Sequence, residues 1–418
     1  MGFEQKINQF LNRYPNIKKR IKRIYQRFFY LFSKKIKYEG NVICVSPNDG
    51  REYFFGYYDK SPWNSTGKYI LCMQANCTWK DVSPKEPLNI LLLDTENKFK
   101  PMKIATSYSW NVQMGCMAQW LGPKFDDEII YNDFRDGQYC SIILNIITKK
   151  ERVIHKPIYS VSSDGKIALT LDFSRLYNLR PGYGYHNVEE ETKGIKLPNT
   201  TCIWKINLEN EEIEELLTYK DFYNFKPREE MINPNSIHKV NHIMLSPSGN
   251  RFMVLYRWFV GERKYTRLIT CNVDGSDMYL LNDCDMVSHC FWKDDNHIIA
   301  FENKNGIGTG YFLMEDQTSN YIKLIKDVNY DGHPSYSPDL NHIVTDSYPS
   351  RNRMQEIRIF NEKDENRIVA KVFAPFRYDN DVRCDLHPRW SRDSKKICFD
   401  GSFDGNRKLY ILEVNKDE

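Results

Sequence analysis

A seven-residue frame that opens with histidine recurs four times in the C-terminal half of the chain. The copies read "HIMLSPS" from His242, "HCFWKDD" from His289, "HPSYSPD" from His333 and "HPRWSRD" from His387. The fourth residue of each copy is large and apolar, and the last three copies have Asp at the seventh position. The whole chain holds only 9 His in 418 residues. Histidine therefore keeps one position in four successive units, which indicates a repeat fold.

Two kinds of segment alternate along the chain from residue 41 onward. One is a short strand closed by an acidic or Asn turn, as in "NILLLDTEN" from Asn89, and it occurs seven times. The other is a turn before an inner pair of strands, as in "KSPWNSTGKYILCM" from Lys60, and it also occurs seven times, the four histidine copies included. The units are mostly about 40 to 60 residues apart, the size of a four-stranded propeller blade. We predict an all-β, seven-bladed β-propeller over residues 41–418. The alternative, a pair of β-sandwiches, does not explain the matched repeats.

Two departures from a regular repeat carry further predictions. The last blade supplies three strands, so "NVICVS" from Asn41 is expected to be its fourth strand and to close the ring with the two chain ends. The stretch around residues 171–235 is longer than the other units and holds an insertion. Long insertions in a rigid scaffold usually lie on one face and often carry function.

Residues 1–40 form a separate basic segment. Eleven Lys and Arg stand against the single acid Glu4 in residues 1–38, a net charge of 11 − 1 = +10, whereas the whole chain is +4. Apolar residues recur there every three or four positions, which predicts a basic amphipathic helix. Such a helix suits an anionic membrane surface; the alternative is that its apolar stripe packs on the propeller. Nucleic acid is not expected as a partner, because the basic residues do not continue into the body. The apolar positions are Phe3, Ile7, Phe10, Tyr14, Ile17, Ile21, Ile24, Phe28 and Leu31.

The cysteines favour a reducing compartment. There are 11, an odd number, and no pair has C-x-x-C spacing, which argues for free thiols rather than a disulfide framework. The first 38 residues also lack the apolar core of a secretory signal. We therefore expect a cytoplasmic protein, peripheral to the inner membrane through residues 1–38.

The four histidines of the frame are expected at one end of the central channel, because each precedes its turn by the same number of residues. Neutral imidazole is a common metal ligand and a natural base near neutral pH. Convergence of four therefore favours a metal site or an acid–base site. The alternative is that each ring only bonds the neighbouring blade. The last copy has further polar neighbours in "RCDLHPRW", among them Cys384, Asp385 and Arg389.

The segments "HPSYSPD", "RCDLHPRWSRD" and "LDFSRLYNLRPGYGY" resemble the β-propeller polysaccharide lyases, most of all the oligogalacturonate lyases and more loosely the ulvan lyases; the S-P-D turns are also found in TolB-like repeats. The resemblance implies a divalent metal, Mn, Ca or Zn, held by His289, His333 and His387, with His242 as the base. No nucleotide cofactor is expected. The family supplies two close histidines and a glutamine from its last blade. Here Cys384 and Asp385 precede His387 instead, and we add Asp385 to the candidate ligands.

The resemblance to lyases assigns possible roles to other polar residues. β-Elimination from a uronate removes the proton next to the carboxylate, which requires neutralisation of the enolate charge. Arginine can bind a carboxylate at two points and tyrosine can pass a proton to the leaving oxygen. The alternatives are a packed loop for the Tyr-rich insertion and hydrogen bonds between blades for the amides. The candidates are Arg180 and Tyr185 for catalysis, and Arg175, Tyr183, Arg257, Asn132, Tyr58 and Arg389 for substrate binding.

We therefore expect a carbohydrate-active propeller that cleaves acidic oligo- or polysaccharide, in surface-polysaccharide metabolism. The alternative is a propeller without catalytic activity that binds a glycan, or scaffolds polysaccharide biosynthesis at the membrane face.

Overall fold

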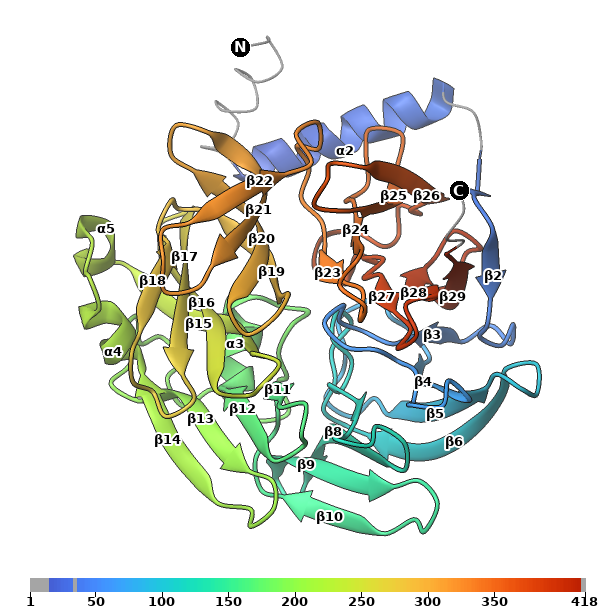
Figure 1. The fold of residues 1–418 in the computed structure, drawn as a ribbon, viewed down its shortest axis with the longest axis horizontal. Helices are drawn as coiled ribbons and strands as arrows, with labels where there is room; N and C mark the ends of the chain where they lie inside the picture. Colours follow the sequence, from blue (N-terminus) through green and yellow to red (C-terminus); the bar gives the residue numbers. More distant parts are fainter. Residues whose placement is uncertain (1–14, 33–35, 415–418) are drawn as a thin grey trace.

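The chain folds into seven antiparallel sheets around a central axis, six with four strands and one with five, as the computed structural model shows for residues 15–32 and 36–414 (Figure 1). The predicted seven-bladed β-propeller is confirmed. Blades 1 to 3 are β3 (Glu52–Phe54), β4 (Tyr69–Ala75), β5 (Leu88–Asp94) and β6 (Lys100–Ser107); β7 (Gln119–Trp120), β8 (Glu128–Arg135), β9 (Gln138–Asn145) and β10 (Glu151–Ile154); and β11 (Ser160–Val161), β12 (Ile167–Leu171), β13 (Thr201–Asn207) and β14 (Ile213–Thr218).

The remaining four blades contain the four histidine frames. They are β15 (Ile237–Leu245), β16 (Arg251–Val260), β17 (Arg263–Asn272) and β18 (Tyr279–Asn282); β19 (Val287–Trp292), β20 (His297–Lys304), β21 (Gly308–Glu315) and β22 (Tyr321–Leu324); β23 (Ser335–Tyr336), β24 (Ile343–Asp346), β25 (Met354–Phe360) and β26 (Asn366–Phe373); and β27 (Arg389–Trp390), β28 (Lys396–Gly401) and β29 (Lys408–Glu413) with β2 (Val42–Cys44).

The second strand of each blade is largely apolar because each blade packs against a neighbour on both of its faces. β4, with the sequence "YILCMQA", is buried at every position after its first. One apolar cluster joins residues of blades 2, 3 and 4, and another joins blades 6 and 7. The core is therefore distributed between blades, and the polar residues that remain inside must either bridge blades or face the central channel.

The ring closes through the two ends of the propeller, as predicted. β2 pairs with β29, where Val42 lies opposite Leu412, and the Val45 amide donates to the Leu409 carbonyl at 3.0 Å. One strand was not expected: β1 (Tyr38–Glu39) pairs with β26 and adds a fifth strand to blade 6.

The stretch 171–235 is divided by two strands of blade 3. Helix α3 (Phe173–Leu179) and a loop precede β13, and helices α4 (Tyr219–Asn224) and α5 (Glu229–Ile232) follow β14; a 3-10 turn, η1 (Asn380–Val382), lies before blade 7. The Asp172 side chain caps α3 by accepting from the Arg175 amide. The insertion thus contributes α3, whose C-cap residue, Arg180, reaches the region described below.

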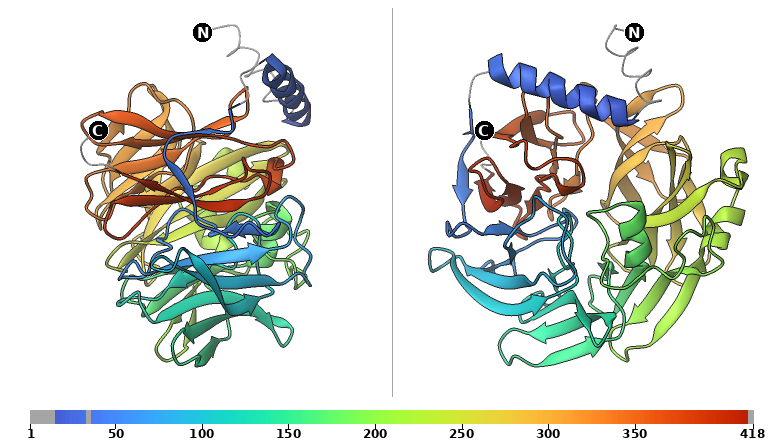
Figure 2. Two further views of the ribbon diagram at one scale, coloured as in Figure 1. Left: turned by 90° about the vertical axis from the view of Figure 1, so that its right-hand side faces the viewer. Right: turned by 180° about the vertical axis from the view of Figure 1, so that it is seen from behind.

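Helix α2 (Pro15–Phe32) lies at the edge of the ring, against blade 6 (Figure 2). The four most N-terminal apolar positions of the expected stripe lie outside the described residues. Over the ranges 15–32 and 36–414, no helix has both the length and the apolar character needed to cross a membrane.

Candidate functional site

The histidine frames place their first residue within or shortly before the innermost strand of blades 4 to 7. His242 lies in the middle of β15 and His289 within β19, whereas His333 and His387 lie two residues before β23 and β27. Both β15 and β19 have a register shift next to the histidine, and such bulges re-aim a side chain. His242 and His387 also have positive φ, 57° and 44°, a conformation that non-glycine residues adopt at a cost.

The four imidazoles converge in the central channel. Ring centroids are 4.0 Å apart between His289 and His333, 4.3 Å between His333 and His387, and 6.4 Å between His242 and His289. The rings of Tyr57 and Tyr58, from the turn of blade 1, fill the space beside them: Tyr57 is 5.2 Å from His387 and Tyr58 is 5.3 Å from His333. The shared frame position therefore corresponds to one shared location.

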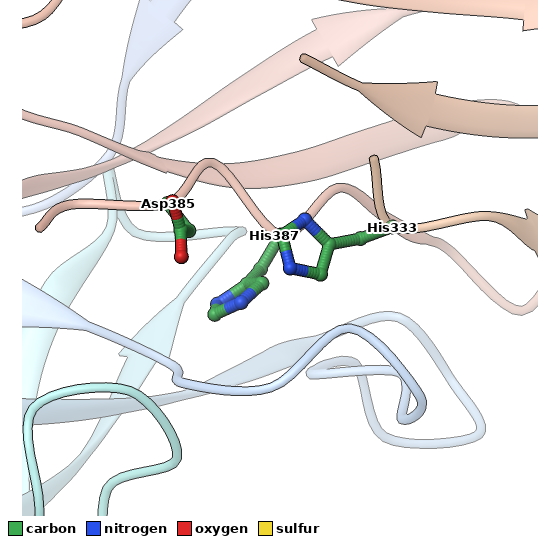
Figure 3. Close-up of side chains that lie close together, drawn as sticks. All are labelled: His333, Asp385 and His387. Atoms are coloured by element: carbon green, nitrogen blue, oxygen red, sulfur yellow. The ribbon is translucent and has the colours of Figure 1, made fainter. Parts of the chain in front are cut away.

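Three buried side chains from blades 6 and 7 form a compact set of metal-ligand atoms. One ligand atom each from His333, Asp385 and His387 lies within 4.8 Å of the others, and Figure 3 shows the three side chains grouped together. Both ring nitrogens of His387 and Nε2 of His333 are buried and accept or donate no hydrogen bond within the described part of the chain. Buried polar atoms without partners are costly, and a divalent cation is the group that nitrogen and carboxylate atoms in this arrangement fit.

Neighbouring carboxylates and carbonyls orient two of these rings. Asp346 Oδ1 accepts from His333 Nδ1 at 2.7 Å, which leaves the lone pair of His333 on Nε2. His289 Nδ1 lies 3.2 Å from Asp331 Oδ1 and 3.1 Å from the Gly332 carbonyl, so its Nε2 is likewise the free acceptor. Each ring thus has the second contact that histidine ligands of metals usually make.

The protonation states of His289, His387 and Asp385 suit ligation. Burial, followed by the nearby His333, lowers the pKa of His289 to about 4, and burial holds the pKa of His387 well below its usual value. The pKa of Asp385 is lowered: burial acts against this, and the Arg383 guanidinium, which donates through Nη2 at 2.8 Å, outweighs it. For His333 the Asp346 charge outweighs burial and raises the pKa, so a cation would have to displace a proton there. The Cys384 thiol, whose pKa burial raises to about 12, is not part of the compact group of ligand atoms.

His242 belongs to a chain of phenols rather than to the ligand set. Its Nδ1 is 3.0 Å from the Tyr57 hydroxyl, and its Nε2 is 3.2 Å from the Tyr58 hydroxyl and 3.1 Å from the Cys290 carbonyl. Tyr58 donates to that same carbonyl at 2.7 Å. We assign the proton of the neutral ring to Nε2, so that Nδ1 accepts from Tyr57. Burial keeps the pKa of His242 well below its usual value, which leaves Nδ1 unprotonated and able to accept a hydrogen bond at pH 7.

A pocket of about 330 Å³ opens beside the cluster, and its walls include Gln113, Arg180, Tyr183 and Arg383. A second pocket of about 630 Å³ shares Tyr348 with the first. The Tyr348 ring lies 5.9 Å from that of His333. The two pockets therefore meet over an aromatic side chain directly above the imidazoles.

Basic groups gather around Arg180 without matching acids. Arg257 is buried, and its Nη1 makes no hydrogen bond to any described residue; burial, then Arg180, lowers its pKa to about 10. Burial, then Arg180, also holds the pKa of buried Lys239 well below its usual value. At the surface, Lys264 has a pKa lowered to about 7, by Arg257 first and then by burial. Such mutual repulsion favours the binding of an anion.

The sequence-predicted site residues divide into two groups. Near the channel or the pocket lie His242, His289, His333, His387, Asp385, Tyr58, Arg180, Tyr183 and Arg257. Arg389 is close but occupied: it binds the Tyr57 carbonyl, the Gly56 carbonyl and Asp400, and so fixes the blade 1 turn against blade 7.

Three predicted residues have contacts typical of framework positions. Asn132 donates to the Ile158 carbonyl at 2.8 Å and to the Tyr185 hydroxyl at 3.0 Å, which ties blade 2 to blade 3. Tyr185 also stacks on Phe173 at 4.3 Å. Arg175 is fully engaged by Glu190 and by backbone carbonyls of the insertion. The structure does not bring these three to the imidazoles.

Several functional candidates were missed. Asp331 precedes the frame of blade 6 by two residues, in "DGHPSY", and Asp346 ends the strand after it. Tyr57 lies in the turn of blade 1, in "GYYDKSPWN", three residues before Lys60, which matches the histidine position when Trp63 is aligned with the fourth residue of the frame. Tyr348 and Arg383 lie in loops with no pattern that marks them.

Comparison with known proteins finds likeness in structure alone. No protein-family model matches the chain, and no curated protein matches its sequence. An oligogalacturonate lyase in complex with manganese matches with a TM-score of 0.64 and 17% identity, over 92% of this chain and 98% of that one. The oligogalacturonate lyase of Vibrio parahaemolyticus matches with a TM-score of 0.62 and 13% identity, over the same shares of 92% and 98%. The β-propeller domain of the Trilobed protease from Pyrococcus furiosus gives 0.52 and 8%, over 88% and 95%. The fold is thus that of the oligogalacturonate lyase propellers.

Proposed function

We propose that the protein is a metal-assisted lyase that cleaves uronate-containing saccharides by β-elimination. The observation that carries the proposal is the group of buried ligand atoms of His333, Asp385 and His387, at the centre of a propeller similar to solved oligogalacturonate lyases, one of them in complex with manganese.

The ligands belong to two neighbouring blades. His333, Asp385 and His387 would hold the cation, and His289 stands next to His333 with its free nitrogen available. Manganese, calcium or zinc remain the candidates; the two or three imidazoles favour manganese or zinc over calcium, which prefers oxygen. A bound divalent cation would neutralise charge that develops on the substrate carboxylate.

Tyr57 and His242 are the pair we propose as the base. Removal of the proton next to the carboxylate breaks a C–H bond, the electron pair forms the new double bond, and the glycosidic C–O bond breaks. The leaving oxygen takes up the proton that the pair of Tyr57 and His242 has received, so that the net reaction moves one proton from carbon to oxygen. The Tyr57 hydroxyl donates to His242 Nδ1, so Tyr57 can accept the substrate proton as its own passes to the imidazole. Burial raises the pKa of Tyr57, which keeps the phenol protonated until His242 takes that proton.

The pocket residues are suited to an acidic saccharide. Arg180 and Arg257 can bind the carboxylate of the sugar, and their mutual repulsion is relieved when they do so. Tyr348, where the two pockets meet, offers a face for a sugar ring. An extended chain could then occupy both pockets with its scissile bond over the imidazoles.

The assay is incubation of the purified protein with uronate oligosaccharides and manganese, calcium or zinc. β-Elimination forms an unsaturated uronate that absorbs in the ultraviolet, and we expect this signal from the wild type. His387→Ala should reduce the rate at least about a hundredfold through loss of a ligand, and Tyr57→Phe should reduce it comparably through loss of the proton relay. His342→Ala, a histidine outside the cluster, is the control. Binding of the saccharide without any unsaturated product would instead support the alternative of a glycan-binding scaffold.

We also propose a reducing, cytoplasmic location. All 11 cysteines are free, which suits a compartment that keeps thiols reduced. If the protein cleaves an acidic saccharide in the cytoplasm, the reaction would be part of surface-polysaccharide metabolism.

A further inference from the structure

Helix α2 turns its polar side toward the propeller. Gln26 Nε2 donates to the carbonyls of Pro349 and Ser350 at 3.2 and 2.9 Å. Arg23 donates to the Phe376 carbonyl at 3.4 Å, and Tyr30, through its ring, stacks on blade 6. Positions 23, 26 and 30 share one side of a helix. The helix is therefore held by hydrogen bonds, by an ion pair between Arg23 and Asp379 and by contacts of aromatic rings rather than by an apolar seam.

The opposite side of α2 is apolar and exposed. Six large apolar side chains share it, at helical spacing of three or four: Ile21 (46% exposed), Ile24 (70%), Tyr25 (40%), Phe28 (57%), Leu31 (70%) and Phe32 (77%). A helix on the surface of a globular protein normally buries its apolar stripe against the core. Here the orientation is reversed, so the alternative that the stripe packs on the propeller is wrong for these residues. No described residue covers the stripe, and an exposed apolar patch of this kind is typical of a binding surface.

The positive charge of this segment indicates the kind of partner that binds the exposed stripe. Arg20, Arg23 and Arg27 are exposed on the same helix, and residues 1–38 contain eleven basic residues against one acid. A basic helix with Ile, Leu, Phe and Tyr on one side is typical of helices that lie in the interface of an anionic bilayer. A second copy of this chain would bring two such positive segments together, which is unfavourable.

We propose that α2 docks the protein onto an anionic lipid surface, with Ile24, Phe28 and Leu31 inserted at the boundary between headgroups and acyl chains. The polar contacts of Arg23, Gln26 and Tyr30 then hold the propeller to the docked helix. Docking needs no rearrangement of the described residues, since the apolar side already points away from the ring.

The docked helix also forms one wall of the candidate site. Arg23 and Gln26 line the same pocket as Arg180 and Arg383. The pocket mouth is thereby held beside the lipid surface, where the saccharides within reach are those carried on membrane lipids. This second step rests on the proposed function, and it names the substrate class as an acidic saccharide attached to a lipid.

Vesicle sedimentation with the full-length protein tests the docking. Vesicles of phosphatidylcholine alone are compared with vesicles that also contain phosphatidylglycerol, and we expect binding to the anionic vesicles. The variant Ile24→Ser, Phe28→Ser, Leu31→Ser should bind at least about tenfold more weakly, because three inserted side chains are lost. The matched control replaces exposed isoleucines of the propeller, Ile147→Ser, Ile195→Ser and Ile322→Ser (67%, 50% and 51% exposed), and should bind as the wild type does.

Replacing basic residues of α2 provides a second test of the docking. Arg20→Gln with Arg27→Gln should weaken binding to anionic vesicles roughly tenfold or more, at about fivefold for each charge, and added salt should act in the same direction.

Three results would overturn the docking proposal. The first is a wild type that does not sediment with anionic vesicles, and the second is a triple α2 variant that binds as tightly as the wild type. The third is self-association in analytical ultracentrifugation that the triple variant abolishes, without vesicle binding, which would assign the stripe to a second copy.

The vesicle assay contains neither saccharide nor metal, so a protein that binds vesicles but cleaves no uronate refutes the proposed function alone. For the substrate class, the wild type should cleave an acidic saccharide anchored in vesicles at least about tenfold faster than the free saccharide, and the triple variant should not; equal rates would refute that step.

Discussion

Asp346 organises the candidate metal centre more than any single histidine does. Its Oδ1 accepts from the His333 ring and from the His333 amide at 2.8 Å, and its Oδ2 accepts from the His387 amide at 3.1 Å. The Asp346 carboxylate thus fixes the tautomer of the His333 ring and holds the backbone amides of both His333 and His387. Because Asp346 makes no direct contact with the substrate pocket, its role is to position His333 and His387.

We expect Asp346→Asn to weaken metal binding about 10- to 100-fold, because the ring of His333 loses its charged partner. Isothermal titration with manganese measures the affinity. Asp294→Asn removes the equivalent partner of His297, at 2.9 Å, outside the cluster, and should leave the affinity unchanged. Equal affinities of Asp346→Asn and the wild type would contradict the role given to Asp346.

His238 should make stability depend on pH. Its ring is buried between the Tyr256 and Ser236 hydroxyls, at 2.7 and 2.8 Å, and burial lowers its pKa from 6.5 to about 4. The unfolded chain therefore takes up a proton below pH 6.5 that the folded chain does not. Its contribution to stability is present above pH 6.5 and is lost as the pH falls toward 4.

His238→Gln should remove that dependence. The free energy of unfolding is measured with urea at several pH values. Between pH 7.5 and pH 4.5 the wild type should lose about 2 to 3 kcal/mol more stability than the variant. His155→Gln, a partly exposed histidine, is the control. A difference that stays constant with pH would refute the assignment.

At the scale of the elements, the closing strand is the weakest junction of the ring, because its three residues join the two ends of the propeller. The Val45 amide extends that pairing with its bond to Leu409. Val45→Pro removes the donor and should destabilise the protein by at least about 2 kcal/mol. Val45→Ala keeps the amide, loses only side-chain packing and should cost about 1 kcal/mol. Urea unfolding compares the two, and an equal loss in both would show that the backbone bond contributes nothing.

The elements that could be predicted are those with a repeated side-chain pattern. The turns and inner strands recur with the same apolar and acidic positions, so their number and the closure by residues 41–46 followed from the sequence. β1 could not be predicted, since its two exposed residues pair with β26 through backbone atoms and leave no pattern.

The same distinction holds for the site. The four histidines share a frame position, so their convergence was predictable. Asp331 precedes His333 by two residues as Asp385 precedes His387, and Asp346 follows His333 by thirteen residues as Asp400 follows His387. Both aspartates therefore have counterparts in the blade 7 unit, and the sequence carried a signal for them. Asn132 and Arg175 were predicted to bind substrate, yet they bridge blades, because sequence alone does not separate a polar residue in the channel from one between two sheets.

For the molecule as a whole, the candidate metal centre joins the last two blades where their innermost strands, β23 and β27, begin. His333 belongs to blade 6, and Asp385 and His387 precede the first strand of blade 7. A cation that binds these three side chains binds only the folded ring. It should stabilise the fold by about 2.7 kcal/mol when its free concentration is a hundred times the dissociation constant.

Thermal unfolding in excess manganese should therefore give a Tm a few degrees above that in a chelator. His387→Ala should abolish the difference, because blade 7 loses the ligand whose two ring nitrogens have no other partner among the described residues. His297→Ala, a surface histidine of blade 5, should retain it. A manganese effect of the same size in His387→Ala would place the cation elsewhere. No effect in the wild type would leave the imidazoles as a structural cluster, and the proposed elimination would then have to neutralise its enolate through Arg180 and Arg257 alone.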